Sequence, residues 1–104
     1  MSKMGQPYTS GRWGVRAGMQ DEFVSRWTEF TEWALVSAPG AEHFVLIRDA
    51  EDPLRFTSFG AWEDKASVDA WRSSPEFAER LGRCRELCDE FVPTDSILTA
   101  AVGI

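Results

Sequence analysis

Residues 56–64 read FTSFGAWED and residues 70–77 read AWRSSPEF, and these two stretches decide the fold of the chain. The first has the composition of a buried strand that runs into a short helix. The second contains a Ser-Ser-Pro-Glu break, at which a second helix begins. The sequence therefore predicts a strand over 54–62, a short helix over 65–72 and a longer helix after the break.

Ser73 and Ser74 both fit the N-cap position of the longer helix. Ser73 forms a capping-box pair with Glu76, whereas Ser74 places Pro75 at the favoured first helical position. Apolar residues then recur at helical spacing, which predicts a stripe made of Phe77, Leu81, Cys84, Cys88 and Phe91. Pro93 is expected to end this helix, and residues 97–102 are expected to form the last strand.

Upstream of the opening stretch, residues 12–17 alternate as a strand does, and a second strand is expected over 43–48. Asp21 and Glu22 suit the first turn of a helix between them, because the helix dipole favours acids there. This helix has an apolar stripe and ends near residues 39–40; the stripe is Phe23, Trp27, Phe30 and Ala34. The strands over 43–48 and 54–62 should pair as an antiparallel hairpin.

The resulting order, β-α-β-β-α-β, predicts an α+β, ferredoxin-like domain with a four-stranded antiparallel sheet. We expect one domain over residues 10–104, preceded by a flexible tail over residues 1–9. Two helices can cover only one face of such a sheet, yet both faces are apolar. Val45 and Ile47 alternate with Phe44 and Leu46, and residues 97–102 are apolar on both sides. A second copy is the simplest cover, so we expect a homodimer whose sheets face each other.

Composition excludes several classes of protein. The formal charge of −6 argues against nucleic-acid and anionic-membrane partners, which select basic surfaces. No apolar run approaches the ~20 residues of a membrane-spanning helix, and the first residues do not resemble a secretion signal. A cytoplasmic location is expected. Cys84 and Cys88 are expected to be buried thiols rather than a disulfide or metal site, since His43 is the only histidine.

The segments, in this order and spacing, resemble the antibiotic biosynthesis monooxygenase family of dimeric α+β barrels over residues 11–103. The resemblance is carried by the first strand into Gly18, the helix from Asp21 to Trp33, the hairpin, residues 62–71 and the restart at 73–77. It implies a pocket between the sheet and the helices. In one enzyme type of this family, aromatic phenols or anthrones are oxidised by O₂ with no flavin, metal or haem; the other type cleaves haem.

The resemblance also suggests site residues. A tryptophan at the position of Trp71 belongs to the pocket in both enzyme types, although a plain core role is an equal alternative. The axial histidine of haem-degrading relatives falls at about Leu81, and their first-strand asparagine at about Gly11. Leucine cannot ligate iron, so haem degradation is the weakest interpretation.

The remaining candidates are weaker. His43 is the only side chain that titrates near neutrality and could assist proton transfer, but this role fails if it faces away from the helices. Arg16 and Arg55 could hold a substrate oxyanion, although strand arginines in an acidic protein more often form ion pairs. Trp27 and Phe30 could line the pocket, with core as the more common role; Trp13 and Trp62 are assigned to the core or to dimer contacts.

The sequence thus favours a cofactor-independent monooxygenase that acts on an aromatic, polyketide-like small molecule with molecular oxygen. The alternative is a non-enzymatic dimer that binds a small ligand, or a stress-related module, because few polar groups are predicted to point inward. No phosphate loop, nucleophile elbow or metal-spaced cluster is present in the sequence.

Overall fold

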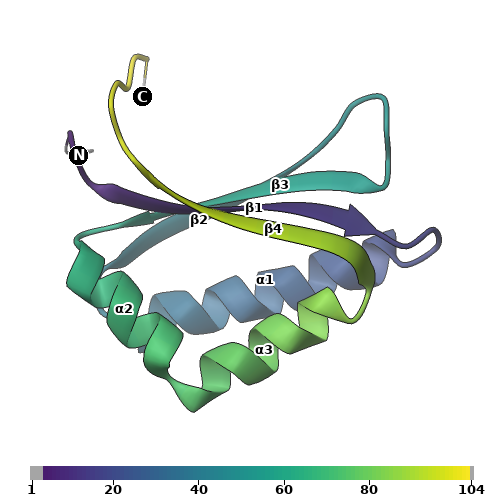
Figure 1. Ribbon diagram of the computed structural model, residues 1–104, viewed down its shortest axis with the longest axis horizontal. Helices are drawn as coiled ribbons and strands as arrows, with labels where there is room; N and C mark the ends of the chain where they lie inside the picture. Colours follow the sequence, from purple (N-terminus) through teal and green to yellow (C-terminus); the bar gives the residue numbers. More distant parts are fainter. Residues whose placement is uncertain (1–3, 104) are drawn as a thin grey trace.

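The structure of the chain is a computed structural model that describes residues 4–103. The elements follow in the order β1 (Pro7–Val15), α1 (Gln20–Ser37), β2 (Ala41–Arg48), β3 (Arg55–Trp62), α2 (Lys65–Ser73), α3 (Pro75–Arg85) and β4 (Cys88–Ile97). The four strands form one sheet in the order β2-β3-β1-β4, and neighbouring strands are antiparallel. This confirms the predicted ferredoxin-like α+β fold and the hairpin. The three helices of residues 4–103 all lie on one side of the sheet (Figure 1), and no helix of these residues covers the other side.

The predicted stripe of α1 is confirmed, since its four residues are all buried. Phe23 packs between two residues of the sheet, with ring centroids 5.1 Å from both Trp13 and Phe56. The acidic side chains Asp21 and Glu22 lie in the first turn, where the helix dipole favours them. The core therefore lies between the sheet and the helices, with α2 and α3 beside α1 on the same side of the sheet (Figure 1).

The break between α2 and α3 uses the second of the two serines. Oγ of Ser74 accepts a hydrogen bond from the backbone N–H of Phe77 (3.2 Å), and Pro75 occupies the first turn of α3. Ser73 instead donates from its Oγ to the carbonyl oxygen of Asp69 (2.8 Å), inside α2. The break orients α2 so that Val68 and Trp71 point into the core.

The prediction for the C-terminal part was wrong in its boundaries. The last helix ends at Arg85, and residues 88–97 form β4 rather than the continuation of the helix. Phe91 lies opposite Trp13 in the ladder with β1, and their ring centroids are 4.1 Å apart. Pro93 is tolerated because β4 is an edge strand with a neighbour on one side only. Proline lacks a backbone N–H, and an edge strand can accommodate that loss where a central strand cannot.

The N-terminal boundary also differs from the expectation. The strand β1 begins at Pro7, inside the segment expected as a tail, and Tyr8 pairs with both Ala61 and Ser96. Residues 7–9 therefore belong to the sheet, because all three pair with β4 and residues 8 and 9 also pair with β3. Residues 1–3 of the expected tail lie outside the described residues.

Both faces of the sheet carry apolar side chains, which include residues of β2 and β3 and none of residues 98–102. Phe44 and Leu46 of β2 pack against the core on the helix side. On the uncovered side Val45, Ile47 and Phe59 are 45%, 51% and 38% exposed. Residues 97–102 do not form the expected last strand, since β4 ends at Ile97 and residues 98–102 are not in a strand. Among residues 4–103, no helix has the length and apolar character needed to cross a membrane.

Candidate active site

A cavity of about 380 Å³ lies between the helix side of the sheet and the helices. Its walls are mainly aromatic rings contributed by most of the elements of the fold. The lining includes Trp13, Trp27, Phe30, Phe44, Trp71, Phe77, Leu81 and Phe91. A cavity of this size and character suits one small, flat, apolar ligand.

Trp71 lies where several of these rings meet. Its ring centroid is 4.6 Å from that of Phe77, 4.7 Å from Trp62 and 5.5 Å from Phe30. The residue is 7% exposed. It reaches this place because α2 is short and amphipathic, so that positions 68 and 71 share its inner face.

The indole N–H of Trp71 distinguishes it from two neighbouring tryptophans. Nε1 of Trp13 donates to Oγ of Ser58 (3.0 Å), and Nε1 of Trp62 donates to Oγ1 of Thr9 (3.1 Å). Nε1 of Trp71 is buried and has no hydrogen-bond partner among residues 4–103. A buried donor without an acceptor costs about 1–3 kcal/mol, which a ligand oxygen could offset.

Three charged residues complete the lining: Arg72, Arg85 and Asp95. The guanidinium of Arg72 binds both carboxylate oxygens of Asp95, with N–O distances of 2.9 and 2.6 Å. These hydrogen bonds raise the pKa of Arg72 and lower the pKa of Asp95, so both stay charged near neutrality. The pair also borders a second cavity, of about 630 Å³, beside the start of β1.

Four of the predicted site residues lie together in the cavity wall: Trp27, Phe30, Trp71 and Leu81. They come from all three helices, and the inward stripes of those helices bring them together. Their placement agrees with a pocket on the helix side of the sheet.

His43 lies elsewhere. It is exposed on β2, in alternation with the inward Phe44, and its ring centroid is 6.3 Å from that of Tyr8. Because it is on the uncovered face of the sheet, it does not line the cavity. Its position does not support a role in proton transfer there.

Arg16 and Arg55 are also outside the cavity, and both form ion pairs. Arg16 contacts Asp89 (3.1 Å) at the end of β1, and Arg55 contacts Glu90 (2.7 Å) across the sheet. Both arginines thus form ion pairs, which is the more common role of strand arginines in an acidic protein.

No pattern in the sequence indicated the three charged residues of the lining. Arg72 follows Trp71 directly, but a helical arginine next to a core residue is usually solvated, so it gave no signal. Asp95 was expected in a loop and Arg85 in the middle of a longer helix. Their places depend on where α3 ends and β4 begins, and that boundary was predicted incorrectly.

Gly11 and Leu81 both line the cavity, at about the positions where the haem-degrading pattern has an asparagine and an axial histidine, respectively. A Cβ atom at Gly11 would lie 2.9 Å from Cε1 of Phe91 and 3.1 Å from Nε1 of Trp13. The ring of Phe91 thus occupies the space that a first-strand side chain needs. Among residues 4–103, no group of three or more His, Cys, Asp or Glu side chains could hold a metal ion.

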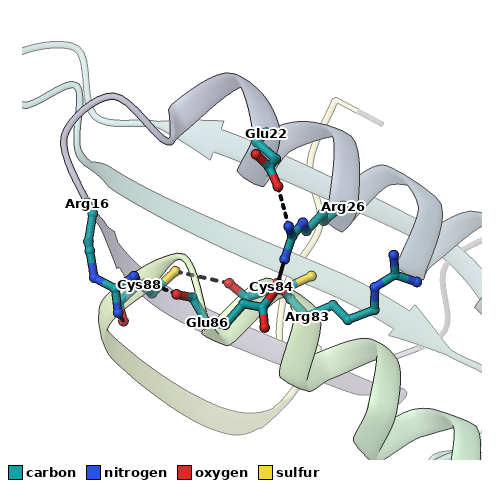
Figure 2. Close-up of polar contacts among 7 residues, drawn as sticks. All are labelled: Arg16, Glu22, Arg26, Arg83, Cys84, Glu86 and Cys88. Carbon is teal, nitrogen blue, oxygen red and sulfur yellow. Dashed lines mark hydrogen bonds and ion pairs between the residues drawn. The ribbon is translucent and has the colours of Figure 1, made fainter.

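Cys84 lies in α3 and Cys88 is the first residue of β4, and both are free thiols outside the cavity lining. Sγ of Cys88 donates to the carbonyl oxygen of Cys84 (3.5 Å), as Figure 2 shows. Burial raises the pKa of Cys84 to about 12 and that of Cys88 to about 11, so neither is a nucleophile at neutral pH. Beside them Arg26 of α1 bonds to Glu22 and Glu86, which ties α1 to the end of α3 (Figure 2).

A model of the antibiotic biosynthesis monooxygenase family matches residues 9–80 of the chain. A search of curated protein sequences finds no match.

Solved structures show the same fold at low sequence identity. The cofactor-independent oxygenase SnoaB from Streptomyces nogalater is 16% identical, with a TM-score of 0.84 over 96% of this chain and 99% of SnoaB. A variant of SnoaB gives a TM-score of 0.86 with the same identity and coverage. A conserved protein from Methanosarcina mazei Go1 is 19% identical, with a TM-score of 0.79 over 93% of this chain and 95% of that protein.

Proposed function

Because the chain belongs to the antibiotic biosynthesis monooxygenase family, we propose that it oxidises an aromatic small molecule with O₂ in the cavity between the sheet and the helices. The proposed reaction uses no cofactor, as in SnoaB, which is a cofactor-independent oxygenase. An anthrone or a dihydroxynaphthalene represents the substrate class.

One observation carries this proposal: Trp71, whose indole N–H is buried and unpaired among residues 4–103, lines an aromatic cavity. The rings offer stacking surfaces for a flat substrate. Aromatic pairs prefer separations of about 4.5–7 Å between their ring centroids. The N–H of Trp71 lacks an acceptor, and a carbonyl or phenolate oxygen on the substrate would supply one. Such a bond fixes the orientation of the ring, which is a main contribution that a protein can make to a reaction of this kind.

The substrate must become an anion before it can reduce O₂. With His43 outside the cavity, the carboxylate of Asp95 is the only acidic or histidine side chain in the lining, and its pKa is lowered by Arg72, so it is a weak base. We therefore assign the proton to water at the cavity mouth. The N–H of Trp71 and the positive charge in the lining then stabilise the substrate anion. Because the anion is stabilised, its formation does not require a strong base.

The chemistry balances for an anthrone. The carbanion transfers one electron to O₂, and the two radicals combine as a peroxide anion at the same ring carbon, which takes a proton back from water to become a hydroperoxide. The O–O bond then breaks, one oxygen atom remains as the new carbonyl, and the other leaves as water with the second hydrogen of that carbon. No external reductant is needed, because the substrate supplies both pairs of electrons.

The uncovered face of the sheet supports a homodimer. Val45 of β2 lies opposite Phe59 of β3, and both are partly exposed beside Ile47 on the face that no helix covers. Burying them against a second copy removes apolar surface from water. Light scattering should give twice the 11.7 kDa chain mass, and Val45→Glu should shift it towards the monomer; a monomeric wild type would contradict the dimer.

Oxygen consumption tests the function. An oxygen electrode should record uptake above the buffer rate for a panel of anthrones and dihydroxynaphthalenes with no cofactor added. Trp71→Phe should reduce that uptake. Background rates across the panel, together with saturable quenching of tryptophan fluorescence by the same compounds, would instead indicate a module that only binds its ligand.

A further inference from the structure

The charge of the cavity is opposite in sign to that of the protein. Its lining carries two arginines and one carboxylate, so its formal charge is +1 (Arg72 and Arg85 against Asp95), whereas the whole chain carries −6. An acidic protein repels anions in general, so a positive lining selects them at this one place.

The positive charge resides on Arg85. Arg72 is bound to Asp95 through two hydrogen bonds, and the charges of that pair cancel. No carboxylate of residues 4–103 forms an ion pair with Arg85. Most of the other arginines are paired in this way, and of the cations in the cavity lining only Arg85 has a guanidinium that is free to bind an oxyanion.

Two features place this guanidinium at the mouth of the cavity. Arg85 is the last residue of α3 and is exposed, so water reaches one side of it. Its Cζ atom lies 5.5 Å from the ring centroid of Phe91, and that ring is part of the cavity wall. A flat ligand held against the aromatic wall would therefore present its edge to the guanidinium.

We propose that Arg85 is a specificity-determining residue that selects aromatic substrates bearing an anionic oxygen group, a carboxylate or an acidic phenol. This inference rests on the proposed function only in using the same cavity. The planar guanidinium pairs with the oxyanion, and the aromatic body of the substrate enters among the rings. Arg16 and Arg55, the arginines suggested by the sequence, are occupied by Asp89 and Glu90.

Calorimetric titration with a matched pair of ligands, 2-naphthoate and the neutral 2-naphthamide, tests the inference. For the wild type we expect naphthoate to bind about tenfold more tightly than naphthamide, the order expected for one charge-assisted contact. Arg85→Gln should bring the ratio close to one, and Arg85→Lys should keep part of the preference. Arg83→Gln is the control, because Arg83 is on the same helix but is not in the lining. Added salt should reduce the wild-type ratio.

The inference is overturned if Arg85→Gln keeps the wild-type ratio, if the wild type has no preference, or if it binds neither ligand. The oxygen electrode separates this result from a failure of the proposed function. Oxygen uptake with equal affinity for the two ligands would refute the role of Arg85 alone. A preference that depends on Arg85, without oxygen uptake on any substrate, would refute the oxygenase alone.

Discussion

The rings of Trp62 and Trp71 lie with their centroids 4.7 Å apart, yet of the two only Trp62 has a hydrogen-bond acceptor for its indole N–H within residues 4–103. Trp62 donates to Thr9 and thereby belongs to the structure of the sheet. Trp71 is buried just as well but keeps an unpaired donor. Such a donor costs stability unless something accepts it, and the proposed function assigns that acceptor to an oxygen atom of the substrate.

Replacing Trp71 with Phe should separate ligand binding from stability. The variant keeps an aromatic ring in place and removes the unpaired N–H, so we expect the free energy of unfolding to change by less than about 1 kcal/mol, because loss of ring volume and loss of an unsatisfied donor oppose each other. Affinity for a carbonyl-bearing aromatic should fall about tenfold. Urea unfolding and calorimetric titration measure the two effects.

The control for this prediction is Trp62→Phe. It removes a satisfied hydrogen bond together with the same ring volume, so it should lose more stability than Trp71→Phe and less affinity. The reverse order in both measurements would show that the N–H of Trp71 has no role in binding.

Gly11 is required by the close approach of Phe91. Gly11→Ala places Cβ 2.9 Å from Cε1 of that ring, and the ring cannot move without disturbing its contact with Trp13. We expect a loss of about 1–3 kcal/mol of stability from overpacking. Gly82→Ala is the matched control: nothing lies within 4 Å of its Cβ position in α3, so it should gain up to ~1 kcal/mol. Equal melting temperatures for the two variants would contradict this account.

Asp95→Asn should strengthen anion binding. The substitution removes the carboxylate that occupies Arg72 and raises the formal charge of the lining from +1 to +2. We expect affinity for 2-naphthoate to rise severalfold, while affinity for 2-naphthamide stays constant; both are measured by calorimetry. A fall in naphthoate affinity would mean that the pair holds the cavity in shape rather than adjusting its charge.

The cysteines predict how stability depends on alkaline pH. Burial raises the pKa of Cys84 from its ordinary 9.0 to about 12, so the folded state retains a proton that the unfolded state loses. Above pH 9 the unfolded state therefore binds fewer protons, and stability falls with rising pH until the folded thiol also ionises near pH 12. Melting temperatures of the wild type and Cys84→Ala between pH 8 and pH 11 measure this, and the decline should be shallower in the variant. Parallel curves would show that other groups cause the decline.

Local patterns were enough to predict most of the fold. The stripe of α1, the hairpin and the restart at Ser74 and Pro75 each depend on residues close together in sequence, and all three are confirmed. The same patterns brought Trp27, Phe30, Trp71 and Leu81 to one cavity, because inward helical positions converge in any fold of this kind.

Pairing between strands that are distant in sequence explains why the boundary between α3 and β4 was not predicted. Cys84, Cys88 and Phe91 fit a helical period, but Phe91 packs on Trp13 in a strand ladder, and no local signal favours that ladder over the helix. The position of Arg85 at the cavity mouth follows from this boundary. His43 illustrates a second limit: its chemistry is suggestive, but one step of strand alternation places it on the opposite face of the sheet.

Labelling with ¹⁸O₂ tests the central claim most directly. An anthrone is incubated under ¹⁸O₂ with and without the protein, and the quinone is analysed by mass spectrometry. We predict that the protein accelerates product formation and that each quinone made in the accelerated reaction carries one ¹⁸O atom at the oxidised carbon, with the second ¹⁸O in water. Product formation at the rate of the buffer alone, or a quinone whose new oxygen comes from water, would contradict the proposal that this cavity is an oxygenase active site.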